Sequence, residues 1–96
     1  MYEIIYSKAA ERYFKKIKNK NLLRTFKNAI DKLKNDPYAG TRKVGDLRGI
    51  YGYGVKYRGS DYELAYRIYE KNGRFVIILL AGTRENFYEE LKRLVR

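Results

Sequence analysis

The sequence predicts a small α+β domain in which antiparallel strands pack on a helical hairpin. Two observations indicate this class: apolar residues recur at helical spacing over the first third of the chain, and apolar and polar residues alternate over 51–58 and 62–69. With 96 residues, 45% of them hydrophobic, the chain has the composition of one folded globular domain, which we expect to span residues 1–96.

The first third of the chain predicts a strand followed by two helices. Residues 2–6 alternate and are rich in β-forming side chains, and Ser7 then offers an oxygen that caps a helix. Apolar residues recur at helical spacing over 10–17 and again over 22–33, and the polar stretch 19–21 interrupts them. We therefore expect an antiparallel pair of amphipathic helices whose apolar positions belong to the core.

The middle of the chain predicts a β-hairpin after a polar loop over residues 37–46. Aromatic and apolar side chains alternate with Gly, Lys and Arg over 51–58, and the alternation returns over 62–69. Gly59-Ser60 fits the two-residue loop between these strands. The tight register then pairs these residues across the strands: Arg58 with Asp61, Lys56 with Glu63, Gly54 with Ala65, and Gly52 with Arg67.

The last third of the chain predicts a buried strand and a terminal helix. Asn72-Gly73 supplies a turn, and residues 74–81 are apolar on both faces, so we expect this strand to be central. Apolar residues at helical spacing mark a helix from about Glu85. The expected order is β, α, α, β, β, β, α, with the helical hairpin on one face of the sheet and a basic surface on the other.

The charge balance indicates a polyanionic partner, either nucleic acid or an acidic protein segment. The chain has 22 Lys and Arg residues against 11 Asp and Glu residues, a formal net charge of +11. A lysine-rich helical pair is also compatible with a simple solvated surface. The candidate contacts to RNA or the ribosome are Lys8, Arg12, Lys15, Lys16, Arg24, Lys27, Arg42, Lys43 and Arg48.

The missing residue types restrict the chemistry. The chain has no Cys and no His, which excludes disulfides, thiolate metal sites and thiol nucleophiles and removes the commonest general base. Any catalysis must use Lys, Arg, Tyr or a carboxylate. The longest apolar run, residues 75–81, is far shorter than the ~20 residues of a membrane-spanning helix, and no signal sequence is evident. We expect a cytoplasmic protein without membrane association.

Four features occur in order along this basic chain. They are the β-α-α start, Leu47-Arg48-Gly49 before the sheet, the strands over 53–58 and 62–67, and Gly82-Thr83-Arg84-Glu85-Asn86-Phe87-Tyr88 after the last strand. Together they resemble the RelE/ParE superfamily of toxins from toxin-antitoxin systems. The resemblance implies a cytosolic toxin that an acidic antitoxin holds inactive. In the RelE branch it implies an endoribonuclease that cuts mRNA in the ribosomal decoding site, with ribosome and mRNA as partners.

The resemblance also suggests a set of candidate catalytic residues. They are Lys56, Arg58, Glu63, Arg67, Arg84 and Tyr88. The first two fall where RelE-like toxins keep basic residues on the second strand of the sheet. The last two match an Arg and, at a shorter spacing, a Tyr that follow the last strand of the family.

Two positions depart from the family pattern. Gly54 stands where the best-known RelE pattern has another Lys, and Glu63 stands where most ribonuclease members have Arg. Arg67 lies on the same face of its strand as Glu63, so it is a candidate for supplying the missing charge.

The candidates fit cleavage of RNA by its own 2′-hydroxyl group. This reaction needs a base for the hydroxyl, cations around the phosphate, and an acid for the departing 5′-oxygen. Lys56, Arg58 and Arg84 would supply the cations. The base is either Lys56 or Glu63, and Tyr88 either stacks on a nucleobase, donates a proton or packs the last helix.

We expect neither a metal nor a cofactor. Glu85, Glu89 and Glu90 fit the first turn or the exposed face of a helix at least as well as a divalent-metal site. The expected reaction is therefore metal-free.

Two other functions fit the same sequence. The departures at Gly54 and Glu63 favour a ParE-like inhibitor of DNA gyrase, which binds its target without chemistry. The charge and aromatic content alone favour a non-catalytic RNA-binding module. A gyrase supercoiling assay distinguishes the first alternative, and growth arrest on expression without a partner argues against the second.

Overall fold

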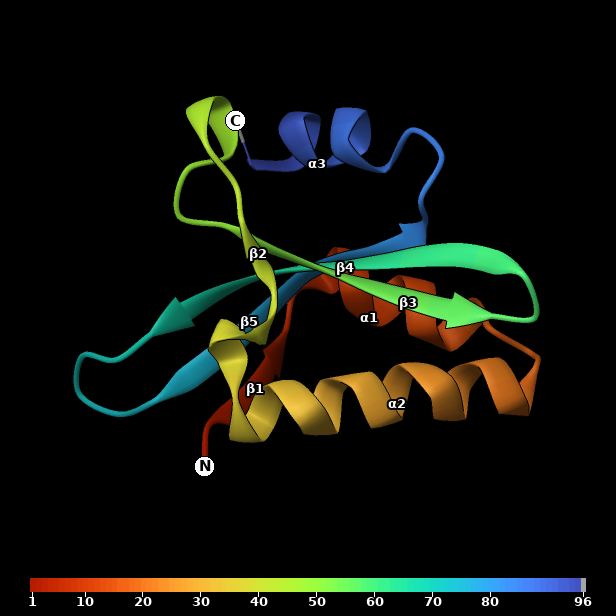
Figure 1. Ribbon diagram of the computed structural model, residues 1–96, viewed down its shortest axis with the longest axis horizontal. Coiled ribbons are helices and arrows are strands. Elements are labelled where there is room, and N and C mark those ends of the chain that lie inside the picture. The colour runs from red at the N-terminus through yellow and green to blue at the C-terminus, as the bar shows by residue number, and fades with distance from the viewer. Residues whose placement is uncertain (96) are drawn as a thin grey trace.

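The computed structural model describes residues 1–95, which form a five-stranded sheet with helices on both faces (Figure 1). The strand order is β1-β5-β4-β3-β2, with β1 parallel to β5 and the other neighbours antiparallel. The predicted α+β class is confirmed, and the last strand is an inner strand of the sheet. Along the chain the elements are β1 (Glu3–Tyr6), α1 (Lys8–Lys16), α2 (Lys20–Asn35), β2 (Thr41–Arg42), β3 (Tyr51–Tyr57), β4 (Ser60–Tyr69), β5 (Phe75–Thr83) and α3 (Phe87–Val95).

Side-chain caps fix the starts of α1 and α2. The Ser7 hydroxyl accepts a hydrogen bond from the Ala10 amide at 3.0 Å and donates one to the Leu79 carbonyl at 2.6 Å, which ties α1 to β5. Asn19 Oδ1 accepts from the Asn21 and Leu22 amides. The expected interruption between the helices is therefore short, because α2 begins directly after the Asn19 cap.

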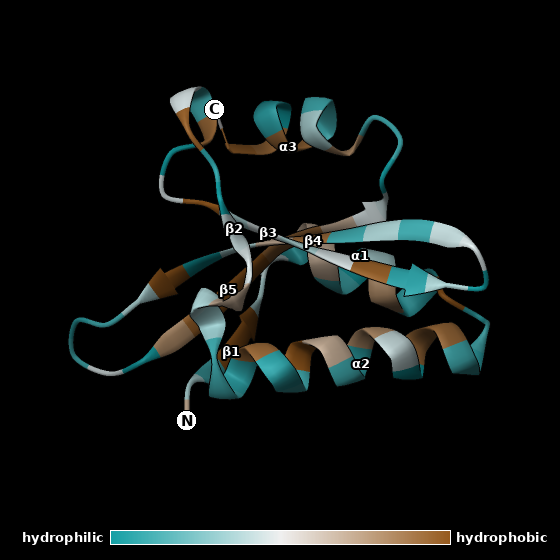
Figure 2. Ribbon diagram, in the orientation of Figure 1, coloured by the Kyte–Doolittle hydropathy of each residue, from teal (hydrophilic) through white to brown (hydrophobic). Residues whose placement is uncertain are grey.

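The main core lies between the sheet and the α1/α2 layer. Phe26 of α2 is fully buried, and its ring meets those of Phe14 and Tyr62 edge to face at centroid distances of 5.4 and 5.6 Å. Figure 2 shows hydrophobic and hydrophilic segments alternating along α2, as expected for a helix with one buried face. The predicted core positions of α2 are thus confirmed except at Leu23, which is 39% exposed.

The expectation of a basic surface on the opposite face of the sheet is wrong where α3 lies. In Figure 1, α3 lies on the other side of the sheet from α1 and α2. Phe87 and Leu91 of α3 are buried with Ala65 and Leu80 of the sheet in a second, smaller core. The apolar stripe of an amphipathic helix requires an apolar partner, and this part of the sheet provides one.

The β3–β4 hairpin has a different register from the predicted one. Lys56 pairs with Asp61, Gly54 with Glu63 and Gly52 with Ala65, so the predicted Lys56–Glu63 pair does not form. The two turn residues are Arg58 and Gly59, with φ of +48° and +79°, which is the left-handed conformation that tight hairpins require. Each strand keeps its predicted faces, because the pairing moves by an even number of residues.

The segment predicted as a loop over residues 37–46 contains regular structure. The short strand β2 pairs with the start of β3, and short 3-10 helices occupy Pro37–Ala39 and Gly45–Leu47. The buried Tyr66 hydroxyl donates to the Pro37 carbonyl at 2.6 Å and accepts from the Gly40 amide at 3.2 Å. This strand-to-loop anchor holds the segment against the sheet.

Candidate active site

The site is centred on Glu63, a buried charged residue in the middle strand of the sheet. Glu63 is 5% exposed and lies across the sheet from Gly54 of β3 and Gly82 of β5. Neither neighbour has a side chain, so the carboxylate occupies the space above the strands on the α3 face. Its Oε1 atom is shielded from solvent and has no hydrogen-bond partner in the structure. A buried carboxylate oxygen without a partner is costly for the folded state, so it marks a candidate site.

Tyr88 of α3 contacts the other oxygen of this carboxylate. The Tyr88 hydroxyl donates a hydrogen bond to Glu63 Oε2. Burial, followed by this hydrogen bond and the charge of Glu63, raises the pKa of Tyr88 well above its usual range, and the charge of Arg84 offsets part of the rise. Tyr88 is therefore a protonated donor at neutral pH, and it holds the carboxylate in one orientation.

Lys43 is the third member of the site. Its Nζ lies 4.6 Å from the centroid of the Tyr88 ring, within the range of a cation–π contact. We predicted Lys43 only as a contact to RNA or the ribosome. The alternation pattern could not place it, because it directly follows the two-residue strand β2 inside the expected loop.

Gly52 makes the close approach of these three side chains possible. A Cβ at this position would lie 2.6 Å from the Tyr88 hydroxyl, 2.8 Å from Lys43 Cε and 2.9 Å from Glu63 Oε2. Gly52 is thus the floor of the site, a role that residue type and alternation alone did not indicate. We call the constellation of Lys43, Gly52, Glu63 and Tyr88 the Glu63 site.

An open cleft adjoins the Glu63 site. It has a volume of about 490 Å³ and is lined by Lys43 and residues 44–47 on one side and by Tyr88 and Lys92 of α3 on the other. Its walls carry two cations, one carboxylate, Asp46, and a tyrosine ring, and the excess positive charge suits a ligand that carries both phosphate and an aromatic base.

Three of the predicted catalytic cations lie near the turn of the β3–β4 hairpin. Lys56 is largely exposed and forms an ion pair with Asp61 at 3.5 Å. Arg58 lies in the turn, with its guanidinium 5.7 Å from the Tyr57 ring centroid. Arg84 is exposed, and its backbone amide donates to the Asp61 carbonyl at 3.0 Å. The charge of Arg84 lowers the pKa of Tyr88 and so links this residue to the Glu63 site.

Arg67 lies at the other end of α3 from the Glu63 site. It shares a face of β4 with Glu63, as predicted, but Ala65 stands between them beneath Phe87 and Leu91. Arg67 instead lines a separate cleft with Lys8. The structure does not bring Arg67 to Glu63.

The nine predicted RNA or ribosome contacts are spread over several elements. Apart from Lys43, which is half-buried, all of them are exposed. Lys15, Lys16, Arg24 and Lys27 lie on α1 and α2, on the face of the sheet opposite the Glu63 site, and Arg42 and Arg48 flank Lys43 in the chain. The basic residues therefore form no single surface around the carboxylate.

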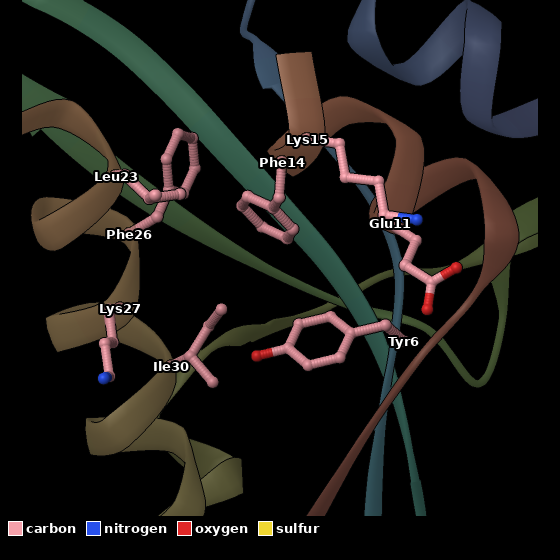
Figure 3. Close-up of a pocket in the computed structure, with 8 residues that line it drawn as sticks. All are labelled: Tyr6, Glu11, Phe14, Lys15, Leu23, Phe26, Lys27 and Ile30. Carbon is pink, nitrogen blue, oxygen red and sulfur yellow. The ribbon is translucent and has the colours of Figure 1, made fainter. Parts of the chain in front are cut away.

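A mainly apolar groove separates α1 and α2 on the opposite face. In Figure 3 the rings of Tyr6 and Phe14 point toward Phe26 and Ile30 across the groove. Its volume is about 340 Å³, and Leu23 at its wall is 39% exposed. An unfilled apolar groove of this kind is typical of a protein-interaction site.

Residues 1–95 contain no group of three or more Asp or Glu side chains placed to hold a metal ion. Within the same residues, none of the helices combines the length and apolar character that crossing a membrane requires.

Comparison with known proteins identifies the family. Residues 4–92 match the model of a ParE-like toxin of type II bacterial toxin-antitoxin systems. A comparison with curated proteins finds no match.

Solved structures of toxins have the same fold. A chain of the toxin-antitoxin complex RelBE2 from Mycobacterium tuberculosis is 26% identical, with a TM-score of 0.66 over 86% of this chain and 98% of that one. The isolated RelE toxin of E. coli is 19% identical, with a TM-score of 0.68 over 99% of this chain and 100% of that one. A chain of the intact E. coli RelBE complex is 18% identical, with a TM-score of 0.68 over 86% and 96% of the two chains. The chain therefore belongs to the ParE-like toxins of type II bacterial toxin-antitoxin systems and has the fold of RelE.

Proposed function

We propose that this toxin is a ribosome-dependent endoribonuclease that cleaves mRNA in the cytoplasm without a metal ion. The observation that carries the proposal is the Glu63 carboxylate, which is buried, held by Tyr88 through Oε2, and left with an unpartnered acceptor at Oε1. A ribose 2′-hydroxyl is a donor that this oxygen lacks. In this mechanism Glu63 is the base. The pairing of Lys56 with Asp61 at the hairpin turn supports this choice over Lys56.

In the proposed reaction, Oε1 of Glu63 accepts the proton of the 2′-hydroxyl. The 2′-oxygen then forms a bond to the adjacent phosphorus, and the bond from phosphorus to the 5′-oxygen of the next nucleotide breaks. The leaving oxygen takes a proton from Lys43, whose ammonium group lies over the Tyr88 ring. The products are a 2′,3′-cyclic phosphate and a free 5′-hydroxyl, and Arg84 stabilises the charge that develops on the phosphate.

Substrate entry requires a side-chain movement at the site. Oε1 is sealed from solvent, so a ribose hydroxyl reaches it only when a covering group moves away. Lys43 has a long flexible side chain and is half-buried. Exchange of its contact with Tyr88 for one with the RNA phosphate would open the site at small cost.

The test is cleavage of mRNA by purified toxin added to translating ribosomes, with the new 5′ ends mapped. Glu63→Gln keeps the shape but removes the proton acceptor, so we expect the cleavage rate at saturating ribosomes to fall by about 10²–10⁴-fold. Glu89→Gln, at an exposed position in the first turn of α3, is the matched control and keeps its rate. No new 5′ ends with the unmutated toxin would refute the proposed function, and an undiminished rate for Glu63→Gln would refute its mechanism.

We further propose an acidic antitoxin as the partner at the α1/α2 groove. The groove offers apolar side chains flanked by two cations, Lys15 and Lys27, and one carboxylate, Glu11. Its apolar lining and excess positive charge complement a segment that is partly apolar and negatively charged. Leu23→Asp, at the exposed wall of the groove, places a like charge there and should weaken antitoxin binding while mRNA cleavage continues. Unchanged antitoxin affinity for that variant would place the interface elsewhere.

A second candidate function is inhibition of DNA gyrase. It is favoured by the family description and by the separation of Arg67, Lys56 and Arg58 from Glu63. A supercoiling assay with purified gyrase distinguishes the two functions. The alternative would be established if the Glu63→Gln variant inhibits supercoiling and the unmutated toxin cleaves no mRNA. Growth arrest in either case would exclude a simple RNA-binding module.

A further inference from the structure

A second cleft with three basic residues lies at the far end of α3. Its cationic side chains are Lys8 and Arg12 of α1 and Arg67 of β4, and its volume is about 440 Å³. Leu79 of β5 and the last residues of α3 complete its walls. None of the described residues that line it is acidic. We call it the Arg67 cleft.

Among the described residues, no carboxylate forms an ion pair with the three cations of the Arg67 cleft. Over residues 1–95 the only ion pair is the one between Lys56 and Asp61, at the hairpin turn. Arg67 is half-buried, so its charge is partly removed from water without compensation. Like charges that converge on one cleft repel one another, and an anion that binds among them relieves this repulsion.

The backbone around the cleft holds these side chains in place. Gly49 has φ of +89°, and a Cβ there would lie 2.9 Å from Arg67 Nη1, so the glycine allows the guanidinium to approach the backbone closely. The bond from the Ser7 hydroxyl to the Leu79 carbonyl fixes the start of α1 on the sheet. Lys8 and Arg12, four residues apart, then project from the same side of that helix.

We infer that the Arg67 cleft binds backbone phosphate groups of RNA away from the bond that is cleaved. Arginine forms paired hydrogen bonds with phosphate, and the cleft presents two arginines and a lysine from separate elements. Arg67 lies on the same face of β4 as Glu63, four residues along the strand, which corresponds to about 13 Å. One RNA strand of a few nucleotides spans that distance. The inference rests on the proposed function for the choice of RNA as the ligand.

The experiment measures binding of a fluorescein-labelled single-stranded RNA of twelve nucleotides, fully 2′-O-methylated so that it cannot be cleaved. Fluorescence anisotropy at several salt concentrations gives the affinity and its salt dependence. For the double variant Arg12→Gln/Arg67→Gln we expect the slope of log affinity against log salt to become shallower by about 1.4, which is about 0.7 for each lost phosphate contact. The control Lys18→Gln/Lys20→Gln removes the same charge at exposed positions outside the Arg67 cleft and should leave the slope nearly unchanged.

The outcomes are separable from those of the cleavage test, because the methylated RNA needs no catalysis to bind. An equal effect of both double variants, or no effect of either, would overturn the inference. The inference would also be overturned if Arg12→Gln/Arg67→Gln lowered the affinity for the acidic antitoxin but left RNA binding intact, since the cleft would then be a protein contact. Thermal unfolding of each variant checks that it still folds. The single variant Arg12→Gln changes an exposed residue, and it should still make the slope of log affinity against log salt shallower by about 0.7.

Discussion

Substitution of Gly52 by alanine tests whether the Glu63 site is as closely packed as the structure shows. The new Cβ would lie within 3 Å of the Tyr88 hydroxyl, Lys43 Cε and Glu63 Oε2, so each of these three contacts has to be relieved. Lys43 can swing into solvent at small cost. Tyr88 cannot move without losing its hydrogen bond to the buried carboxylate.

The expected change in the free energy of unfolding for Gly52→Ala follows from two opposing contributions. Loss of a hydrogen bond to a buried charged group costs about 1.5–3 kcal/mol, while the lower chain entropy of alanine in the unfolded state returns about 0.4–1 kcal/mol. Gly52 does not have a positive φ, so the backbone itself accepts alanine. We expect a net destabilisation of about 1–2 kcal/mol, which lowers the Tm of a chain of this size by roughly 4–16 °C.

The assay is thermal unfolding followed by circular dichroism for Gly52→Ala, Tyr88→Phe and the double variant. Because both single changes remove the same hydrogen bond, their effects on the free energy of unfolding should fall well short of additive. Gly52→Ala should also slow mRNA cleavage. A Gly52→Ala protein as stable as the unmutated one, or fully additive effects in the double variant, would refute the packing that we describe.

Three further predictions concern other parts of the molecule. Arg84→Ala should reduce toxicity by on the order of a hundredfold without affecting the fold, whereas Arg93→Ala should not; undiminished growth arrest would remove Arg84 from the site. The Tyr2 and Tyr38 hydroxyls donate hydrogen bonds to Glu70 and lower the pKa of its carboxyl. This cluster therefore stabilises the fold above the pKa of Glu70 in the unfolded chain, about 4.3. The stabilisation is lost as the pH falls through the lower pKa that Glu70 has in the folded protein. The same contact with Glu70 raises the pKa of Tyr38 to about 12, so its contribution is also lost between about pH 10 and 12; urea unfolding of Tyr38→Phe should show a weaker dependence in both ranges. Association with the antitoxin should slow as ionic strength rises, and an on-rate independent of salt would contradict the electrostatic part of that interface.

The faces of the hairpin could be predicted from sequence, but its register could not. Alternation over 51–58 and 62–69 assigns each side chain to a face whatever the pairing. The register depends on which two residues form the turn, and Gly59 is compatible with either position. Arg58 adopts a positive φ that few residues other than glycine favour, so the sequence indicated the wrong turn and with it a Lys56–Glu63 pair.

The composition of the site was only partly predictable for a similar reason. Glu63 and Tyr88 were candidates because of their residue types and the family pattern, and the structure brings them together. Lys43 follows a strand of two residues, which is too short for any periodic signal. The packing of α3 on the sheet depends on Ala65, which belongs to the second core. Its side chain is small and lies between polar positions of the strand, so the sequence gave no indication of that core.

The parallel pairing of β1 with β5 also has a consequence for the order of synthesis and folding. Glu3 pairs with Phe75, so the first strand of the sheet finds its partner 72 residues later in the chain. Until β5 has been made, β1 has no neighbour, and the strand that carries Glu63 lacks the partner that places Gly82 beside it. Contacts between such distant positions form late and slowly during folding. The Glu63 site, which also needs Tyr88 of α3, is therefore complete only after both β5 and α3 have been synthesised, and a partner present at that time has the opportunity to bind before the site has formed.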